Sequence, residues 1–177
     1  MARGWTASAI ALLLLQASIG AAQPVAAAAP TRERVLTMAR EIMVAARYGT
    51  LITLGPDGQP QARLVDPLEP DAAFRVFVAT NPLSRKVTEI RKDSRVTLLY
   101  FDTSRLGYVT AIGRAFEVRD EEKGAHRKKE WQAFFPAEKP EGYVLYRIVL
   151  SRLEVVSPRD GLNGDALTWR PEILEIK

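Results

Sequence analysis

The stretch that decides the fold is Val78-Ala-Thr-Asn-Pro-Leu-Ser-Arg-Lys-Val-Thr-Glu-Ile90. Its first residues are small, apolar or β-branched and predict the end of a β-strand at Thr80. The Asn81-Pro82 dipeptide that follows favours a turn. Ser84 is a residue type that caps helices, and the apolar residues after it are three positions apart, so we expect a helix from Ser84 to Lys92. The stretch is therefore predicted to be a strand, a tight turn and a short helix.

The start of this helix carries two cations, Arg85 and Lys86. Positive charges in a first helical turn oppose the helix dipole and cost about 0.3–1 kcal/mol each when exposed. A bound anion compensates them directly, because a helix N-terminus also offers free N–H groups. Arg63, on the preceding hairpin, adds a planar guanidinium group that can donate two parallel hydrogen bonds. Three cations together suit a phosphate dianion. The alternative is a solvated charged turn, since Lys and Arg mostly lie exposed.

Six segments around this stretch have the composition of β-strands. Pro56-Asp57-Gly58 is a strong turn signal between the first two and predicts a β-hairpin. The order lacks alternating βαβ units, so a doubly wound nucleotide-binding fold is not expected. We predict a mainly β, α+β fold, a six-stranded antiparallel barrel that is closed or nearly closed. The predicted strands are Leu51–Leu54, Gln61–Val65, Phe74–Thr80, Arg95–Phe101, Tyr108–Val118 and Tyr143–Val156.

Two further helices are predicted. Thr31–Tyr48 has apolar residues at helical spacing, with Thr31 as a cap and Gly49 as a stop. Asp120–Phe135 opens with three acidic residues, which suits a helix N-terminus. The tail, Asp160–Lys177, ends in a possible strand over Glu172–Ile176. Residues 31–177 are expected to form one domain, because no linker or internal repeat divides them.

The composition excludes several classes of protein. Of 177 residues, 47% are hydrophobic and 26% charged, which is typical of a globular chain and not of a disordered or fibrous one. The chain has no cysteine, which excludes disulfides and thiolate metal sites, and its single histidine, His126, excludes a poly-histidine metal site. His126 lies in a basic run, where we expect a solvated position. The net charge of +4 does not by itself indicate nucleic-acid binding, and we expect neither a metal nor a nucleic acid as partner.

Residues Met1–Ala22 have the pattern of a signal peptide. Arg3 precedes an apolar run, and small residues follow that run and predict cleavage before Gln23. The leucine-rich centre of the run is too short to span a bilayer. Gln23–Pro30 is an alanine- and proline-rich leader that we expect to be disordered. The prediction is an exported protein, periplasmic or secreted, with no membrane span after cleavage.

Three short motifs resemble the flavin-binding signature of the pyridoxamine 5′-phosphate oxidase-like split β-barrel family. They are Arg63-Leu-Val65, Ala79-Thr-Asn81 and Ser84-Arg-Lys86, in the family's order and with its four-residue step from the threonine to the serine. Trp131-Gln-Ala-Phe-Phe-Pro136, followed by Gly142–Leu150, is similar to the general-stress-protein branch of that superfamily. The resemblance spans residues 47–156, which is most of the chain after the leader.

The resemblance implies a split barrel that forms a homodimer and holds FMN at the dimer interface. The FMN phosphate would be held by Arg63, Arg85 and Lys86, with the hydroxyls of Thr80 and Ser84 as donors. Apolar or backbone contacts along the flavin would come from Leu64, Val65 and Ala79. Tyr108, five residues before Gly113, stands where the oxidase has a glutamine that contacts the flavin.

The resemblance does not extend to the oxidase's own substrate. Leu68 stands where the oxidase has a lysine, and its pyridoxal-phosphate-binding residues have no clear match, so pyridoxamine-phosphate oxidase activity is not expected. We expect an exported FMN-binding flavoprotein, an oxidoreductase acting on an unidentified small molecule, with the redox chemistry carried by the flavin. No residue is identified as a catalytic acid or base.

Two alternatives remain open at the level of sequence. The first is a cofactor-free split barrel that acts as an interaction protein. The signal peptide favours it, because Sec-type export threads an unfolded chain, and FMN would then have to be acquired outside the cytoplasm. The second is a split barrel that binds haem or the deazaflavin F420. A visible spectrum of the purified protein distinguishes these readings.

Overall fold

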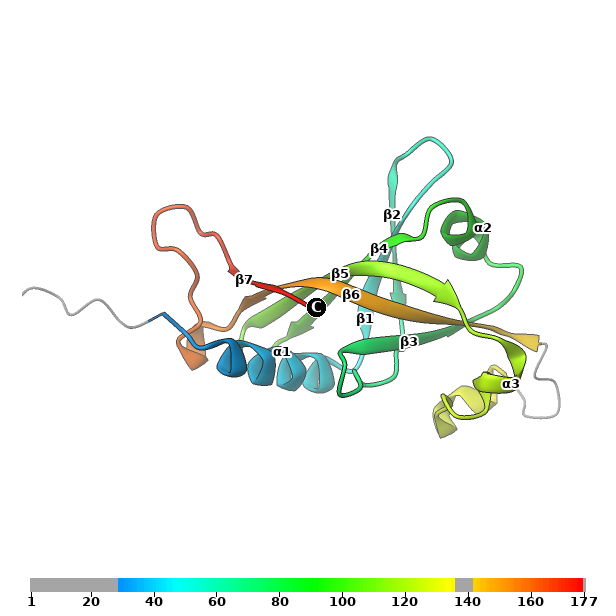
Figure 1. The fold of residues 1–177 in the computed structure, drawn as a ribbon, viewed down its shortest axis with the longest axis horizontal. Helices are drawn as coiled ribbons and strands as arrows, with labels where there is room; N and C mark the ends of the chain where they lie inside the picture. Colours follow the sequence, from blue (N-terminus) through cyan, green and yellow to red (C-terminus); the bar gives the residue numbers. More distant parts are fainter. Residues whose placement is uncertain (1–28, 136–141, 177) are drawn as a thin grey trace, which may run out of the picture.

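The computed structural model describes residues 29–135 and 142–176 (Figure 1). The predicted signal peptide and most of the leader lie outside the described residues. Helix α1 (Arg32–Ala46) begins as expected, with the Thr31 hydroxyl accepting a hydrogen bond from the Arg34 amide at 3.3 Å. It ends two residues earlier than predicted, because Arg47 takes a positive φ of 58° and closes the helix. Gly49 therefore begins the first strand and does not serve as the helix stop.

One antiparallel sheet of seven strands forms the body of the molecule. The strand order is β2-β1-β4-β5-β6-β3, and β7 pairs with β6. All six predicted strands are present, and β7 confirms the possible C-terminal strand. Since β2 and β3 stand at the two ends of this order, the sheet is not closed. The bounds are β1 Gly49–Leu54, β2 Pro60–Val65, β3 Arg75–Thr80, β4 Arg95–Asp102, β5 Gly107–Glu117, β6 Val144–Val156 and β7 Glu172–Glu175.

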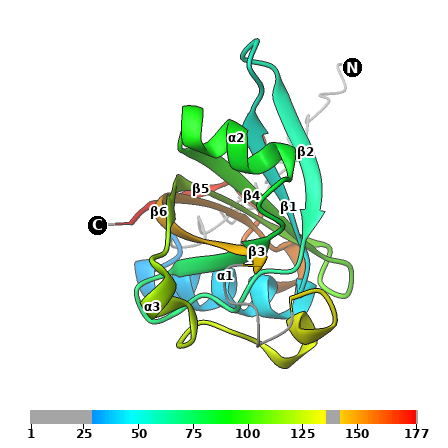
Figure 2. The ribbon, with the colours of Figure 1, turned by 90° about the vertical axis from the view of Figure 1, so that its right-hand side faces the viewer.

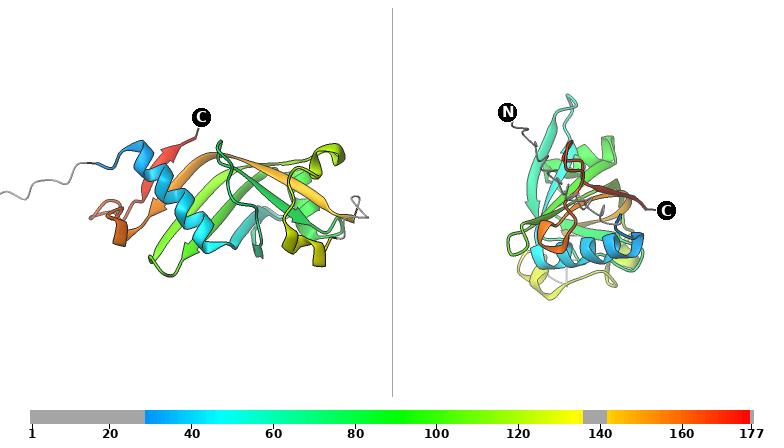
Figure 3. Two further views of the ribbon diagram at one scale, coloured as in Figure 1. Left: turned by 90° about the horizontal axis from the view of Figure 1, so that it is seen from below. Right: turned by 90° about the vertical axis from the view of Figure 1, so that its left-hand side faces the viewer.

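The main core lies between α1 and one face of the sheet, and Figure 3 shows α1 crossing that face diagonally. Buried and half-exposed residues alternate along most of β5, so every second side chain points toward α1. A bulge at Ile112/Gly113 interrupts the pairing of β5 with β6. A Cβ added at Gly113 would lie 2.2 Å from the carbonyl oxygen of Val149, so only glycine fits there. The other face of the sheet stays partly exposed.

Residues 120–135 do not form the continuous helix that the sequence predicted. Only α3 (Asp120–Lys123) and the 3₁₀ helix η1 (Lys129–Ala133) are helical. Gly124 weakens a helix at the break. Tertiary contacts then decide the path of the chain, because Trp131 is buried and its Nε1 donates to the Asp66 carbonyl at 3.1 Å.

His126 also departs from the prediction of a solvated position. Its ring stacks on Phe77, with the centroids 3.8 Å apart and the planes 13° from parallel. Phe77 belongs to a second apolar cluster with Trp131 and Tyr143. The basic run therefore contributes packing as well as charge.

Helix α2 (Arg85–Lys92) follows β3 and lies beside β1 and β2 at one end of the sheet (Figure 2). Val87 and Ile90 are buried in the main core, as the spacing predicted. This packing brings the start of α2 close to Thr80, the last residue of β3, and to Arg63 on β2. Among the described residues, no helix is both long and apolar enough to cross a bilayer.

Candidate functional site

The start of α2 gathers two hydroxyls and an ammonium group. Ser84 occupies the N-cap position but its side chain makes no capping bond; its Oγ lies 3.1 Å from Oγ1 of Thr80 instead. Lys86 turns back from the helix and donates from Nζ to Thr80 Oγ1 at 2.8 Å. The first-turn N–H groups therefore lack the usual hydroxyl cap, at a helix end that carries cations.

Glu89, one turn further along α2, is the buried centre of the cluster. Its side chain is 2% exposed, and Oε2 accepts hydrogen bonds from the Thr53 hydroxyl at 2.5 Å and from Arg63 Nη2 at 2.6 Å. Arg63 also donates to that hydroxyl and, at 2.7 Å, to the Gln61 carbonyl. Arg63 lies on β2, at one edge of the sheet, and α2 follows β3, at the other edge. The Arg63–Glu89 pair therefore links strand β2 to helix α2.

Arg85 is the outermost member of the cluster. Its Nε lies 2.9 Å from Oε1 of Glu89, while 67% of its side chain is exposed. The orientation of this pair leaves Oε1 without a hydrogen bond among the described residues. Three cations and one carboxylate leave a net charge of +2. That charge matches a phosphate monoester near neutral pH, which carries about −1.5 to −2.

The charges of the cluster shift one another's pKa values. Burial and the positive charge of Arg63 lower the pKa of Lys86, and Glu89 offsets part of this effect. Burial acts to raise the pKa of Glu89, but hydrogen bonds from Thr53 and Arg63, together with the charges of Arg63 and Arg85, outweigh it and lower that pKa. Glu89 is therefore held as a carboxylate, and the positive charge of Lys86 is less favourable here than in a free lysine.

The structure brings five of the predicted site residues together: Arg63, Thr80, Ser84, Arg85 and Lys86. It places the three apolar ones apart from this cluster. Leu64 points to solvent with 69% exposure, Val65 is buried in the main core, and Ala79 packs against the second apolar cluster. Leu64 and Ala79 are next to Arg63 and Thr80 along their strands, and Val65 is two residues after Arg63.

Tyr108 lies at the other end of the sheet from the cation cluster. It is near the start of β5, opposite Phe101 on β4 and Val156 on β6. Across the sheet, Thr53 of the cation cluster is aligned through β4 with Gly113 on β5. Gly113 lies five residues after Tyr108, which places Tyr108 roughly 17 Å along the strand from that position. Tyr108 is therefore not part of the cation cluster, and a contact to the same ligand requires an elongated molecule.

Sequence reasoning missed Glu89 and Thr53. The one available signal was the four-residue spacing between Arg85 and Glu89, which places the two side chains on one helix face. Nothing in the local pattern pointed to Thr53, whose hydroxyl comes from a strand 36 residues before Glu89.

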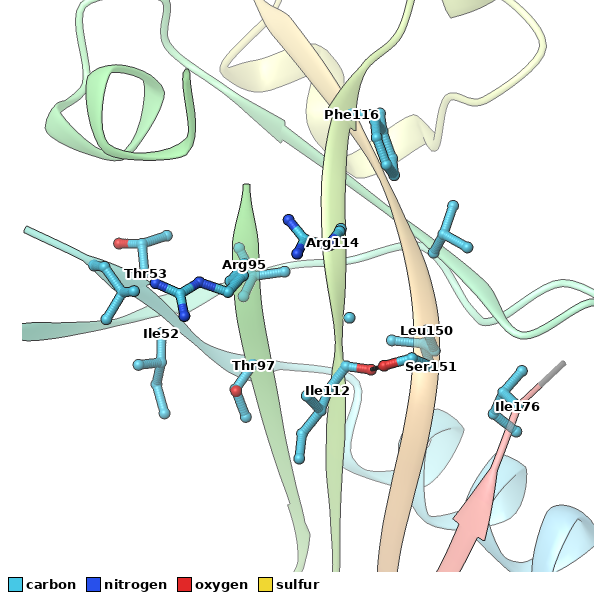
Figure 4. A pocket seen from close by; sticks show the side chains of 14 residues that line it. Ile52, Thr53, Arg95, Thr97, Ile112, Arg114, Phe116, Leu150, Ser151 and Ile176 are labelled. Carbon is cyan, nitrogen blue, oxygen red and sulfur yellow. Dashed lines mark hydrogen bonds between the residues drawn. The ribbon is translucent and has the colours of Figure 1, made fainter. Parts of the chain in front are cut away.

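The sheet face turned away from α1 holds an apolar trough of about 640 Å³. Figure 4 shows side chains from several strands around it, with Arg95 and Arg114 toward the end marked by Phe116, and Ile112 toward the other. Thr53 lines the trough as well as belonging to the cation cluster. The two features therefore adjoin, one apolar and one positively charged. Among the described residues, no group of three or more His, Cys, Asp or Glu side chains could hold a metal ion.

Comparison with known proteins agrees with this architecture. The family model described as pyridoxamine 5′-phosphate oxidase matches residues 37–156. A Clostridium acetobutylicum protein related to general stress protein 26 of B. subtilis, of the pyridoxinephosphate oxidase family, is 14% identical, with a TM-score of 0.69 over 82% of this chain and 97% of that one.

Two further solved structures carry names that mention a cofactor. A pyridoxamine 5′-phosphate oxidase-related, FMN binding protein from Nostoc punctiforme is 18% identical, with a TM-score of 0.54 over 74% of this chain and 86% of that one. A heme binding protein from Mycobacterium smegmatis is also 18% identical, with a TM-score of 0.59 over 72% of this chain and 55% of that one. At these identities the likeness is one of fold.

Proposed function

The chain belongs to the pyridoxamine 5′-phosphate oxidase family, and from that premise we propose that it is an exported FMN-binding flavoprotein that acts as an oxidoreductase on a small molecule. The observation that carries the proposal is the cluster of Arg63, Arg85 and Lys86 around buried Glu89. The net charge of +2, the uncapped helix start and the lowered pKa of Lys86 all fit a bound phosphate dianion.

Each residue of the cluster has a separate task in this proposal. Lys86 and Arg85 neutralise the phosphate, and the hydroxyls of Ser84 and Thr80 donate to its oxygens. Arg63 holds Glu89, with much of its own hydrogen-bonding capacity used inside the protein, so it contributes charge more than direct contact. FMN, when bound, supplies hydride or electron transfer, and the chain's own residues bind and orient it.

The test is a titration of FMN and riboflavin against wild type, Lys86→Ala and Lys92→Ala. Lys92 is the matched control, because it is a cation at the far end of the same helix and donates to the Pro56 carbonyl at 2.9 Å. Loss of one charge-assisted hydrogen bond should weaken FMN binding about 10- to 100-fold in Lys86→Ala. Riboflavin, which lacks the phosphate, should bind all three proteins equally. Equal FMN affinities for the three proteins would contradict the phosphate assignment.

We also propose that the protein is a homodimer, built on the sheet face that holds the apolar trough. Leu99, Phe101, Phe116 and Val149 lie on that face with exposures between 38% and 53%. In Figure 1 the face is flanked by the β1–β2 hairpin and by the loop before β7, both on the side away from α1. That loop holds Leu167 and Trp169, 94% and 84% exposed, which a second subunit would cover.

Haem is the second candidate, favoured only by the name of the Mycobacterium smegmatis relative. The chain's single histidine, His126, is stacked on Phe77 and would have to leave that contact to ligate iron. A visible spectrum separates the candidates. Flavin absorbance supports FMN, and a Soret band supports haem. A colourless protein that rejects added FMN supports the cofactor-free interaction protein, and a deazaflavin spectrum supports F420.

A further inference from the structure

The apolar trough on the sheet face turned away from α1 carries charge of one sign only. Its volume of about 640 Å³ lies in the range of small-molecule sites. Most of its wall is apolar, and its charged side chains are those of Arg95 and Arg114, which Figure 4 shows toward the same end. No carboxylate is among the described residues of the wall. The trough therefore complements a molecule with an apolar body and a negatively charged end.

Arg95 and Arg114 face each other across two strands. They are paired directly in the antiparallel register of β4 and β5, and both are exposed. Residues paired in this way project from the same face of a sheet, with Cβ atoms about 4.5–5.5 Å apart, and like charges directly opposite each other are destabilising. An anion bound beside both guanidinium groups would offset this repulsion.

A single carboxylate, that of Asp93, is paired with these two arginines, and it serves Arg95. Arg95 Nη2 lies 2.6 Å from Asp93 Oδ2, and the hydrogen bonds from Arg95 lower the pKa of Asp93 to about 2, so Asp93 stays ionised. Arg114 donates instead to the neutral Ser94 hydroxyl at 3.1 Å, and no ion pair joins it to a carboxylate in the part of the chain that the structure describes.

The charge that remains selects the kind of anion. Two arginines and one aspartate leave a net charge of +1 at this end of the trough. That charge matches a carboxylate, which carries −1, better than a phosphate monoester, which carries about −1.5 to −2. A guanidinium group can also hold a carboxylate through two parallel hydrogen bonds.

We propose that the trough binds a small organic carboxylic acid with an apolar body, whose carboxylate is held by Arg114 beside Arg95. The site shares only Thr53 with the cation cluster, and binding here does not require FMN. Lys86→Ala should therefore keep wild-type affinity for the acid, and Arg114→Gln should keep wild-type affinity for FMN. A failure of the flavin proposal would leave this one standing.

The trough lies in the face on which the homodimer is proposed, since Phe116 and Val149 belong to both. A second subunit on that face would lie over the opening and hold the acid between the two subunits, where less water screens its charge. The competing occupant is a side chain of the second copy, which would keep small acids out.

The probes are phenylacetate, phenylacetamide and acetate. The amide has nearly the shape of phenylacetate without its charge, and acetate has the charge without the apolar body. Binding is followed on the purified protein by NMR of ¹³C-methyl-labelled isoleucine. Ile52 and Ile112 line the trough, whereas Ile42 on α1 is buried in the main core and serves as an internal control.

Phenylacetate should shift the Ile52 and Ile112 signals in a saturable way and leave Ile42 unmoved. It should bind about tenfold more tightly than either other probe, because only phenylacetate offers both the charge and the apolar body. Absence of these shifts at millimolar phenylacetate, which a filled trough would also give, would overturn the proposal. Equal affinities for phenylacetate and phenylacetamide would overturn it as well.

Two variants test the arginine, and both are expected to fold because the substituted side chains are exposed. Arg114→Gln removes one guanidinium group from the trough. Arg119→Gln is the matched control, because Arg119 follows β5, pairs with Glu122 and does not line the trough. Phenylacetate affinity should fall about tenfold in Arg114→Gln only, with phenylacetamide affinity unchanged. Unchanged phenylacetate affinity in Arg114→Gln, or an equal loss in both variants, would refute the site.

Discussion

Replacing Glu89 with glutamine removes the one carboxylate of the cation cluster at nearly constant shape. In the native protein this carboxylate accepts hydrogen bonds at 2.5 and 2.6 Å and forms an ion pair at 2.9 Å. Breaking a fully buried ion pair costs about 3–5 kcal/mol. Since Arg63 is 18% and Arg85 67% exposed, solvent screens part of the loss, and the amide keeps some hydrogen bonds. We expect Glu89→Gln to lower the free energy of unfolding by about 1–3 kcal/mol.

The same substitution should strengthen the effect of a bound anion. Without Glu89 the cluster carries three unopposed cations, so added FMN or inorganic phosphate should restore much of the lost stability. The pH dependence follows from the lowered pKa of Glu89. The folded state binds fewer protons here than the unfolded state, so this stabilisation is complete above the ordinary carboxyl value of about 4.5 and is lost as the pH falls through the folded pKa. The difference between wild type and Glu89→Gln should therefore shrink on acidification.

The assay is urea unfolding of wild type, Glu89→Gln and Glu117→Gln, with and without phosphate, at several pH values. Glu117 is the matched control, since its ion pair with Arg91 is exposed on both sides and such pairs contribute at most about 1 kcal/mol. A Glu89→Gln protein as stable as wild type at neutral pH would refute the idea that Glu89 is the counter-ion of the cluster. Equal stabilisation of all three proteins by phosphate would refute the charge argument.

Three further predictions concern the helix start, the assembly and export. Lys86→Ala should leave the ligand-free protein as stable as wild type or slightly more stable at neutral pH, because the pKa of Lys86 is lowered there, and urea unfolding would show any loss. Light scattering should give a dimer for wild type and a monomer for Phe101→Glu/Phe116→Glu, and a monomeric wild type would reject the assembly. N-terminal sequencing of exported protein should begin at Gln23, and full-length chain retained in the cytoplasm would count against the signal peptide.

The strands could be predicted from the sequence because their information is local. Along β4 and most of β5, buried and exposed residues alternate with the period of a strand, and Pro56-Asp57-Gly58 marks the hairpin. The prediction of a continuous helix over residues 120–135 failed because the deciding contacts are distant in the sequence. Their acidic start favours a helix, but Trp131 and His126 reach partners on the loop after β2 and on β3. Such distant contacts override helix propensity and leave no trace in the local pattern.

The same contrast between local and distant information applies to the candidate site. Its cations could be predicted because Arg85 and Lys86 are adjacent in one motif, and their charges conflict with a helix start wherever that helix lies. The net charge of the assembled site could not be predicted from the sequence, because it depends on Glu89. The partners of Glu89, Arg63 and Thr53, lie 26 and 36 residues away along the chain.

Glu89, which the sequence analysis did not identify, changes the physical interpretation of the site. With three unpaired cations, the ligand-free protein would carry strong repulsion between β2 and the start of α2, and a bound anion would be needed to offset it. With Glu89 buried between Arg63 and Arg85, these two cations already have a counter-ion, and Lys86 is the cation whose pKa is lowered. Anion binding should therefore act mainly at Lys86 and the first turn of α2. For this reason Lys86, rather than Arg63, is the residue at which the phosphate proposal is most directly tested.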